Sequence, residues 1–459
     1  MEPSCSATSG RRDAERPPLR GGVVKLRSRE SRAQRKRAVQ LHLEQLARDL
    51  HLTGERQSVW ALLPIDLLVR ILKLLALPDR GRSAQVCTRW HATYHMPDLW
   101  HQFAFEFVQE TALMASSTPA SLIKQVFERH SADLRHVTIK VDSHQESVAM
   151  ACDVLTQLGV CSLHTLKLSS MLGHSFTSVQ PKQVTDSMRG ILTNSPLKEL
   201  AVAKTLIDDA SLQTMADKSQ ATLTSLKINC CPALSASGIT SVLGSCLHLC
   251  ELTMDYHQVS DALLQAVSTP AHVPMKDISI RVVEPDSGDG SEPVPWQAIS
   301  HVGWDSLSQH SPDVAFALHF LKLEEESYDH FFRHRLPATL LHFGCFIPRL
   351  VLCRVARHCP RLRTLLLANT GTDEPIDGPL AEIGERCLQL QEVQLSGALV
   401  SCAGLVCLAK LCGPRLTTLN IFEDMLLPDE ECNEERMTQE VSHYLQRPWS
   451  AETFPTWPE

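Results

Sequence analysis

The chain has 459 residues, a formal net charge of −8 and 16 cysteines. Its length allows roughly two to four domains, or one long array of repeats. We find no run of about 18 apolar residues and no basic-then-apolar N-terminal leader, so neither a membrane span nor secretion is indicated. Because disulfides are rare in reducing compartments, the cysteines are expected to be free thiols.

Basic residues gather near the N-terminus. Residues 11–37 carry 11 Lys or Arg and 3 acidic residues, which leaves −16 for the rest of the chain. We assign residues 1–58 to a basic, mostly disordered arm. Its run at 35–37 is typical of a nuclear-import patch, and a solvated tail is the alternative. Asp13 and Glu15 disfavour a mitochondrial transit peptide. The acidic body disfavours nucleic-acid binding, which needs clustered cations.

A small helical module is predicted over residues 59–107. Leu63-Pro64 begins its first helix, because proline at the first helical position has the required φ. Apolar residues at spacings of three and four then predict one apolar stripe, formed by Leu67, Leu68, Ile71, Leu72 and Leu75. A second stripe contains Val86 and Trp90, and Leu99-Trp100 follows.

Three helices this short expose more apolar surface than a free domain of about fifty residues usually leaves in water, which indicates docking onto a partner. The pattern resembles the F-box, the module that joins a protein to the Skp-family adaptor of a cullin-RING ubiquitin ligase. An ordinary fragment of a helical bundle is the alternative. The predicted adaptor-binding residues are Leu63, Pro64, Leu67, Leu68, Ile71, Leu75, Leu99 and Trp100.

The body of the chain, residues 108–423, repeats an L-x-x-L-x-L frame. Frames begin at Leu134, Leu163, Leu197, Leu223, Leu249, Met275, Leu362, Leu390 and Leu416. From Leu197 to Met275, and again from Leu390 to Leu416, the spacing is 26 residues. This period is typical of leucine-rich repeats, in which each unit is a concave strand followed by a convex helix. We expect the first unit at Leu134, and convex helices at 211–215 and 262–267.

The predicted fold class is therefore α/β. An N-terminal three-helix F-box is followed by a leucine-rich-repeat solenoid, a horseshoe with parallel strands on the concave side and helices on the convex side.

Two stretches interrupt the period. The segment between Val283 and Trp296 is acidic and rich in Pro and Gly, which predicts an inserted loop. Residues 314–350 lack a leucine frame and contain three glutamates followed by Phe331-Phe332. One interpretation is a partner surface, formed by acidic groups beside exposed aromatic rings. A distorted repeat with a solvated charge run is the other.

Several cysteines keep a fixed place relative to the frame. Cys246, Cys359 and Cys387 lie three residues before a frame leucine, and Cys412 lies four before. This regularity predicts buried structural thiols. The chain has no C-x-x-C pair, H-E-x-x-H, G-x-S-x-G or phosphate-binding glycine loop. We therefore predict no metal, no cofactor and no catalytic activity of its own.

Residues 424–459 are assigned to a C-terminal tail. Pro455 and Pro458 disfavour helix, so Phe454 and Trp457 are expected on an extended end. Burying a tryptophan removes about 150–250 Å² of surface, which contributes about 4–6 kcal/mol gross. Trp457 is therefore predicted to anchor in a partner pocket, and folding back onto the last repeat is the alternative.

Nine short strings are more specific than repeat residues. They are H-M-P-D-L-W at 95–100, L-I-K-Q at 122–125, R-H-S at 129–131, K-V-D-S at 140–143, P-A-T at 337–339, H-F-G at 342–344, C-P-R-L at 359–362, V-S-C at 400–402 and P-T-W at 455–457. Through them the chain, from about residue 60 to 457, resembles the F-box/leucine-rich-repeat proteins that recruit cryptochromes to SCF ubiquitin ligases.

This resemblance implies that the C-terminal repeats cradle a cryptochrome and that the tail places its tryptophan in the flavin pocket, in competition with FAD. Carried over, Trp457 takes that role, with Phe454, Pro455 and Thr456 beside it. The family tail ends at this tryptophan, whereas Pro458 and Glu459 follow here. A contact made by the family's terminal carboxylate is therefore not carried over.

Alternation along the strands adds two concave residues, Gln394 and Asn420, to the predicted cryptochrome contacts. The predicted function is that of an SCF substrate receptor, present in nucleus and cytoplasm, that promotes ubiquitination and degradation of cryptochromes in the circadian clock. Its partners would be the adaptor and cullin through the F-box, and cryptochromes through the C-terminal repeats and tail, without nucleic acid or membrane. A cryptochrome-binding scaffold that competes with a more active ligase subunit is the alternative.

Overall fold

The computed structural model describes residues 59–75, 77–108, 117–142, 144–170, 181–284, 296–368, 374–429 and 432–452. The chain divides into two compact units, residues 1–99 and 100–459. The predicted basic arm, most of the predicted inserted loop (285–295) and the predicted tail anchor (Phe454, Pro455, Thr456 and Trp457) lie outside the described residues.

The first unit consists of short helices. They are η1 (Val59–Leu62), α2 (Ile65–Leu74), α3 (Leu77–Ser83), α4 (Thr88–Tyr94) and the start of α5 (Pro97–Trp100). Pro64 is the N-cap of α2, so the helix begins at Ile65, one position after the predicted start at Pro64. The indole N–H of Trp90 donates to the carbonyl oxygen of Trp60 at 3.0 Å, which ties α4 to η1.

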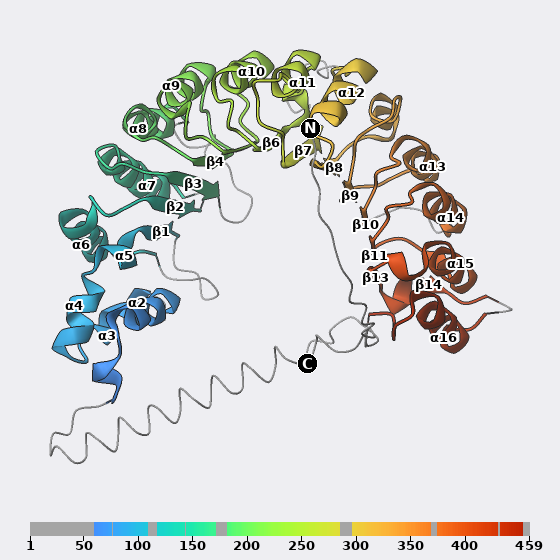
Figure 1. Cartoon of the computed structure of the whole chain (residues 1–459), viewed down its shortest axis with the longest axis horizontal. Coiled ribbons are helices and arrows are strands. Elements are labelled where there is room, and N and C mark those ends of the chain that lie inside the picture. The colour runs from blue at the N-terminus through green and yellow to red at the C-terminus, as the bar shows by residue number, and fades with distance from the viewer. Residues whose placement is uncertain are drawn as a thin grey trace, which may run out of the picture. The chain divides into compact units, whose positions relative to one another are not determined.

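The second unit is a curved solenoid with strands on its concave side and helices on its convex side (Figure 1). Twelve strands form one parallel sheet in sequence order: β1 (Gln102–Phe107), β2 (His136–Val141), β3 (Thr165–Ser170), β4 (Glu199–Ala203), β5 (Ser225–Asn229), β6 (Glu251–Asp255), β7 (Asp277–Val283), β8 (Ala315–Lys322), β9 (Leu340–Phe343), β10 (Thr364–Leu367), β11 (Glu392–Leu395) and β13 (Thr418–Ile421). A second, two-stranded sheet pairs β12 (Val400–Ser401) with β14 (Leu426–Leu427).

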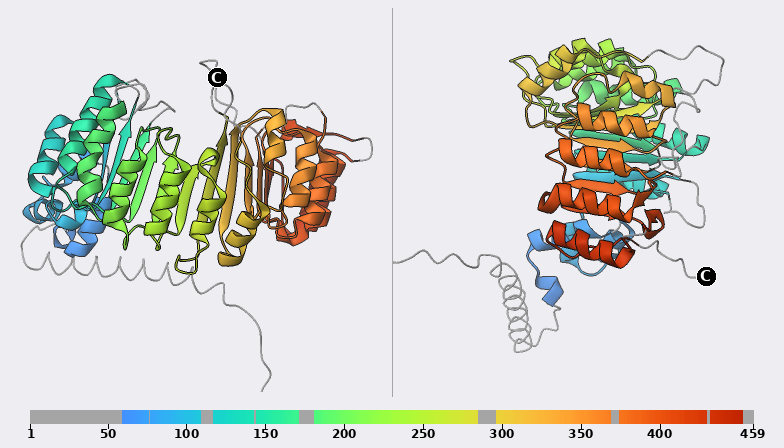
Figure 2. Two further views of the ribbon diagram at one scale, coloured as in Figure 1. Left: turned by 90° about the horizontal axis from the view of Figure 1, so that it is seen from above. Right: turned by 90° about the vertical axis from the view of Figure 1, so that its right-hand side faces the viewer.

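Helices cover the convex side in a single layer (Figure 2). They are α6 (Ala120–His130), α7 (Gln145–Leu158), α8 (Pro181–Asn194), α9 (Asp209–Ser219), α10 (Ala236–Ser245), α11 (Asp261–Val267), α12 (His301–His310), α13 (Arg349–His358), α14 (Asp377–Arg386), α15 (Cys402–Cys412) and α16 (Glu434–Leu445). Short 3-10 turns are η4 (Tyr256–Gln258), η5 (Glu325–His330), η6 (Gly413–Arg415) and η7 (Glu423–Met425). The helices predicted at 211–215 and 262–267 are confirmed.

The leucine frames build the core. Every frame residue from Leu134 to Ile421 has at most 3% of its surface exposed. Equivalent positions pair across the sheet, as Leu226 does with Leu200 and Leu252. The 26-residue period thus places each apolar side chain against its counterpart in the next repeat, and the predicted fold class is confirmed.

The array begins one strand earlier than the leucine pattern predicts. β1 precedes the Leu134 unit and pairs with β2 over its whole length. Its inward residues are Phe103, Phe105 and Phe107, each at most 3% exposed. Phenylalanine fills the same interior positions as leucine, so a search for leucines passes over this strand.

The interpretation of 314–350 as an exposed aromatic surface is wrong. Phe331 and Phe332 are 4% and 3% exposed, and they pack with Phe320 and Phe343, which stack at 4.8 Å. The hydroxyl of the fully buried Tyr328 donates to the carbonyl oxygen of Phe346 at 2.7 Å. The segment is a distorted repeat in which η5 lies between β8 and β9 and aromatic rings replace the leucine frame.

The segment assigned to the tail contains folded structure up to residue 452. Within it, α16 packs against α15 at the end of the array (Figure 2). The indole N–H of the buried Trp449 donates to the carbonyl oxygen of Leu419 at 2.7 Å. The backbone N–H of Glu452 donates to the carbonyl oxygen of Ile421 at 2.8 Å. These contacts fix residues 449–452 beside β13.

The regularly placed cysteines are buried, as predicted. Cys246, Cys359 and Cys387 have no exposed surface and each caps the C-terminus of a convex helix. Burial raises the pKa of Cys246 to about 11 and that of Cys387 to about 12. These thiols therefore stay protonated at neutral pH and act as small packing groups.

A repeated clasp joins neighbouring convex helices. Asp209, the first residue of α9, accepts hydrogen bonds from the amide and hydroxyl of Ser235, the N-cap of α10, at 2.9 and 2.6 Å. Asp261 of α11 binds Ser300, and Asp377 of α14 binds Ser401, in the same way through the backbone amide. Each clasp satisfies an amide at a helix start, where no intrahelical acceptor exists.

Each clasp requires a glycine three residues after the serine. A Cβ atom added to Gly238, Gly303 or Gly404 would overlap the clasping carboxyl group of Asp209, Asp261 or Asp377. The S-x-x-G spacing is therefore a packing requirement between repeats.

We expect Gly238→Ala to lower stability by on the order of 1–3 kcal/mol, because its methyl group displaces Asp209. Gly244→Ala in the same helix meets no atom within 4 Å and should raise stability by about 0.5–1 kcal/mol. Urea unfolding monitored by circular dichroism measures both midpoints. Equal midpoints for the two variants would contradict the clasp.

Candidate interaction surfaces

The F-box helix α2 carries apolar residues on two faces. Leu68, Val69 and Leu72 point inward and are buried. Leu67, Ile71 and Leu74, spaced by four and three residues, form an outward stripe. Leu67 is 45% and Leu74 87% exposed, so this stripe is an apolar surface available to a partner.

The structure divides the predicted adaptor-binding residues into two groups. Pro64 and Leu67 are exposed, and Leu63, Ile71 and Leu75 are half-buried. Leu68, Leu99 and Trp100 are at most 2% exposed. Burial gives this second group a role in holding the fold, which argues against direct adaptor contact.

Trp100, for example, stacks on His130 with ring centroids 4.4 Å apart, inside the solenoid unit. The predicted adaptor-binding residues left out four exposed apolar residues of the first unit, Trp60, Ile65, Leu74 and Val86, although the sequence had placed Val86 in an apolar stripe. A helix apolar on nearly all sides is the signal that could have found Leu74, because only one of its faces can serve the small core.

The concave face of the solenoid is built from the strand residues between the frame positions. One row of register partners crosses it from β6 to β13, listed in order as Asp255, Arg281, His319, His342, Leu366, Gln394 and Asn420. The structure thus brings the predicted residues Gln394 and Asn420 side by side, both half-buried.

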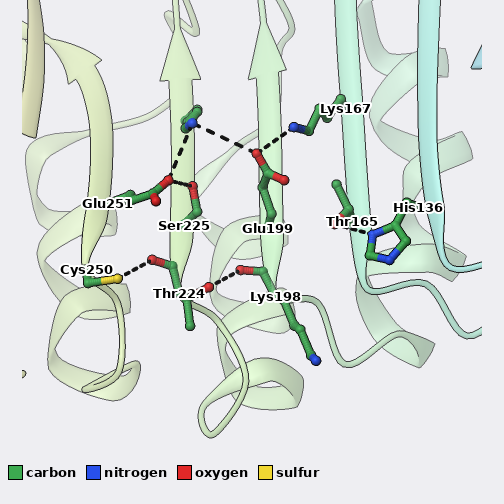
Figure 3. A network of polar contacts seen from close by, with 10 residues as sticks. His136, Thr165, Lys167, Lys198, Glu199, Thr224, Ser225, Cys250 and Glu251 are labelled. Atoms are coloured by element: carbon green, nitrogen blue, oxygen red, sulfur yellow. Dashed lines mark hydrogen bonds and ion pairs between the residues drawn. The ribbon is translucent and has the colours of Figure 1, made fainter. Parts of the chain in front are cut away.

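Charged groups on the N-terminal half of this face are paired with one another (Figure 3). Glu199 of β4 binds Lys167 of β3 at 2.8 Å, and Lys227 of β5 lies 4.0 Å from Glu199 and 3.5 Å from Glu251. Glu251 also accepts a hydrogen bond from Ser225 at 2.9 Å. An ion pair between Lys140 and Glu106, with nitrogen and oxygen 2.7 Å apart, extends this row of ion pairs to β1. We call the row the charged ladder.

The ladder ends at a buried acidic group. Asp255 is 5% exposed, accepts a hydrogen bond from the amide of Cys230 at 2.5 Å and lies 3.6 Å from the Arg281 guanidinium. Burial raises the pKa of this carboxyl, and Arg281 opposes that rise. Arg281 also donates to the sulfur of Cys230 at 3.1 Å.

The C-terminal strands carry few charges, which are the exposed Lys322 at the end of β8 and Glu392 of β11. Between β8 and β13, the concave residues are Ala315, Ala317, His319, Leu321, Leu340, His342, Thr364, Leu366, Glu392, Gln394, Thr418 and Asn420. The single acidic group, Glu392, accepts a hydrogen bond from Thr364 at 3.3 Å. Burial lowers the pKa of His319 and that of His342, which favours the neutral form of both imidazoles. This half is a neutral, partly apolar surface.

Among the described residues, no three or more His, Cys, Asp or Glu side chains gather so that they could hold a metal ion. None of the helices that the structure describes is long and apolar enough to cross a membrane.

Comparison with known proteins agrees with both units. The F-box-like family model matches residues 60–106. F-box/LRR-repeat protein 21 of Mus musculus is 37% identical over 399 residues, 87% of this chain and 91% of the relative. The chain belongs to the F-box/LRR-repeat protein family. The Ovis aries relative of the same name is 36% identical over the same shares. The crystal structure of the yeast Rad7 and Elc1 complex covers 88% of this chain and 95% of that chain, with 12% identity and a TM-score of 0.39.

Membership confirms the predicted F-box. F-box/LRR proteins are typically substrate adaptors of SCF complexes, and the F-box binds a Skp-type adaptor. The chain thus has the substrate-recognition role in such a complex.

We expect Leu67→Asp and Leu74→Asp to abolish co-purification of the adaptor, because each places a charge in the apolar stripe that the adaptor must cover. Replacing Leu63-Pro64 by Ala-Ala should have the same effect. Lys73→Asp, at an exposed residue of the same helix, is the matched control and should retain the adaptor. If Leu67→Asp and Leu74→Asp co-purify with adaptor as the parent does, the stripe is not the docking surface.

Proposed function

We propose that this protein recruits cryptochromes to an SCF ubiquitin ligase, through the C-terminal half of its concave face and through its tail, and so promotes their ubiquitination. The observation that carries the proposal is the neutral surface from β8 to β13, which contains Gln394 and Asn420. Cullin would join through the adaptor. In keeping with the basic run at 35–37, we place this activity in both nucleus and cytoplasm.

Desolvation favours the C-terminal half as the docking surface. Removing water from the paired charges of the N-terminal half costs free energy that their mutual attraction only partly offsets. Alanine, leucine, threonine and amide side chains cost far less to cover, and their hydrogen-bonding groups supply specificity. A large folded substrate should therefore settle on β8 to β13.

The tail supports the same location. The last described residue, Glu452, donates its amide hydrogen bond to the carbonyl oxygen of Ile421, the residue after Asn420. Trp457 follows five residues later, which permits a reach of about 17 Å in an extended chain. A partner seated on β11 and β13 is within that reach, so cradle and anchor can bind one partner together.

The alternative proposal is a cryptochrome-binding scaffold that protects its partner from a more active ligase subunit. The outward apolar stripe of α2 favours the ligase role, because a scaffold has no need of an adaptor surface. Depleting the protein from cells separates the two roles. Cryptochrome should become longer-lived if the protein directs ubiquitination, and shorter-lived if it protects.

We expect Gln394→Arg and Asn420→Arg each to weaken cryptochrome binding at least tenfold, because each introduces an unpaired charge into the neutral surface. Ala201→Arg, a neutral concave residue of β4, is the matched control and should change affinity less than threefold. Biolayer interferometry with the adaptor-bound protein measures all three. Equal losses in the three variants would place the partner on another face.

We expect Trp457→Ala to cost about 2–4 kcal/mol of binding free energy, as deep aromatic anchors do. Added FAD should weaken the parent complex by competition for the flavin pocket, and it should leave the affinity of Trp457→Ala nearly unchanged. Trp449→Ala is unsuitable as a control because Trp449 is buried in the solenoid, so Leu388→Ala, at an apolar residue that is 68% exposed, serves instead. An affinity indifferent to both FAD and Trp457→Ala would assign recognition to the solenoid alone.

A further inference from the structure

Two histidines stand directly opposite each other on the concave face. His319 of β8 and His342 of β9 are register partners on adjacent parallel strands. Their Nδ1 atoms are 3.4 Å apart, and their ring planes meet at 76°. Both side chains are half-buried, and they lie where the charged ladder gives way to the neutral surface.

The separation of the two nitrogens matches a tetrahedral metal. Zinc binds imidazole nitrogen at about 2.0–2.1 Å, so two such ligands at a tetrahedral angle stand about 3.3–3.4 Å apart. The strands hold the two backbones in register, which preorganises the pair. Little conformational entropy would be lost when an ion binds.

The ionic surroundings set the strength expected of such a site. Neutral imidazole is the form that binds a metal ion. The nearest cation in the row, Arg281, is 3.6 Å from the Asp255 carboxylate, which offsets part of its charge. Two ligands with a cation nearby make a weaker site than the four-ligand structural kind.

We propose that His319 and His342 form a two-imidazole binding site for a divalent transition-metal ion such as Zn²⁺. The remaining coordination positions would be filled by water or by a side chain of a docked partner, because the pair faces the concave side. The site is a property of the chain itself and does not depend on the proposed cryptochrome recognition. The competing explanation for the 3.4 Å separation is a plain N–H···N hydrogen bond between the rings.

Zinc titration of the adaptor-bound full chain by isothermal calorimetry, in a buffer that does not chelate, tests the proposal. The variants are His319→Asn, His342→Asn and the double variant, since asparagine keeps a hydrogen-bonding group near the position of Nδ1. His443→Asn, at an exposed histidine of α16, is the control. Each single variant should lose at least tenfold in affinity for one Zn²⁺ site, and the control should lose none.

The double variant carries the sharper result. If both rings hold one ion, losing the second ring after the first should change affinity less than about threefold, because chelation is already broken. Copper bound to the unmodified protein gives a readout that needs no variant, since its electron paramagnetic resonance spectrum should show coupling to two imidazole nitrogens. Unchanged zinc affinity in both single variants, or coupling to nitrogen from neither histidine, would leave the hydrogen bond as the explanation and overturn the proposal.

Discussion

A repeat in this protein has too little interior to bury its own apolar residues, so each one depends on its neighbours. The strand residues Leu200, Leu226, Leu252 and Ile278 are buried only because they stand in one register across four strands. Stability is then a sum over adjacent interfaces. An interruption survives if it supplies equivalent apolar volume, as Phe320, Phe331 and Phe343 do where the leucines are missing.

The same architecture divides the concave face by chemistry. Inward positions are fixed by the core, but the residues between them are free to carry any polarity. In the N-terminal half they carry acids and bases that neutralise one another, and in the C-terminal half they are mostly uncharged. A partner that reads shape and hydrogen bonds is better served by the second surface, because few charges must be desolvated there.

Much of this organisation could be predicted from the sequence, because its causes are local or strictly periodic. The 26-residue period predicted the solenoid, and alternation placed Gln394 and Asn420 on one face. The strand at Phe103 to Phe107 was missed because its inward residues are phenylalanine, and the search was for leucine. The buried position of Phe331-Phe332 was missed because burial depends on Phe320 and Phe343, which come from neighbouring strands.

Side-chain contacts between repeats could not be predicted from the sequence for the same reason. His319 and His342 are 23 residues apart, a separation that the distorted repeat makes irregular, so no fixed period predicts that they meet. Within the F-box, local spacing predicted an apolar helix but gave no means to separate Leu68, which faces the core, from Leu67, which faces solvent. That division is set by where α4 packs on α2.

The clasps between helices divide the convex layer into bonded pairs. In the part of the chain that the structure describes, they join α9 to α10, α11 to α12 and α14 to α15. Of the two gaps between clasped pairs, the longer runs from α12 to α14 and contains the aromatic repeat. Beside His319 and His342 the repeats are therefore held together by strand pairing and by the packing of Phe320 with Phe331 and Phe343, so close fit between rings takes the place of the carboxylate-to-amide bonds found elsewhere.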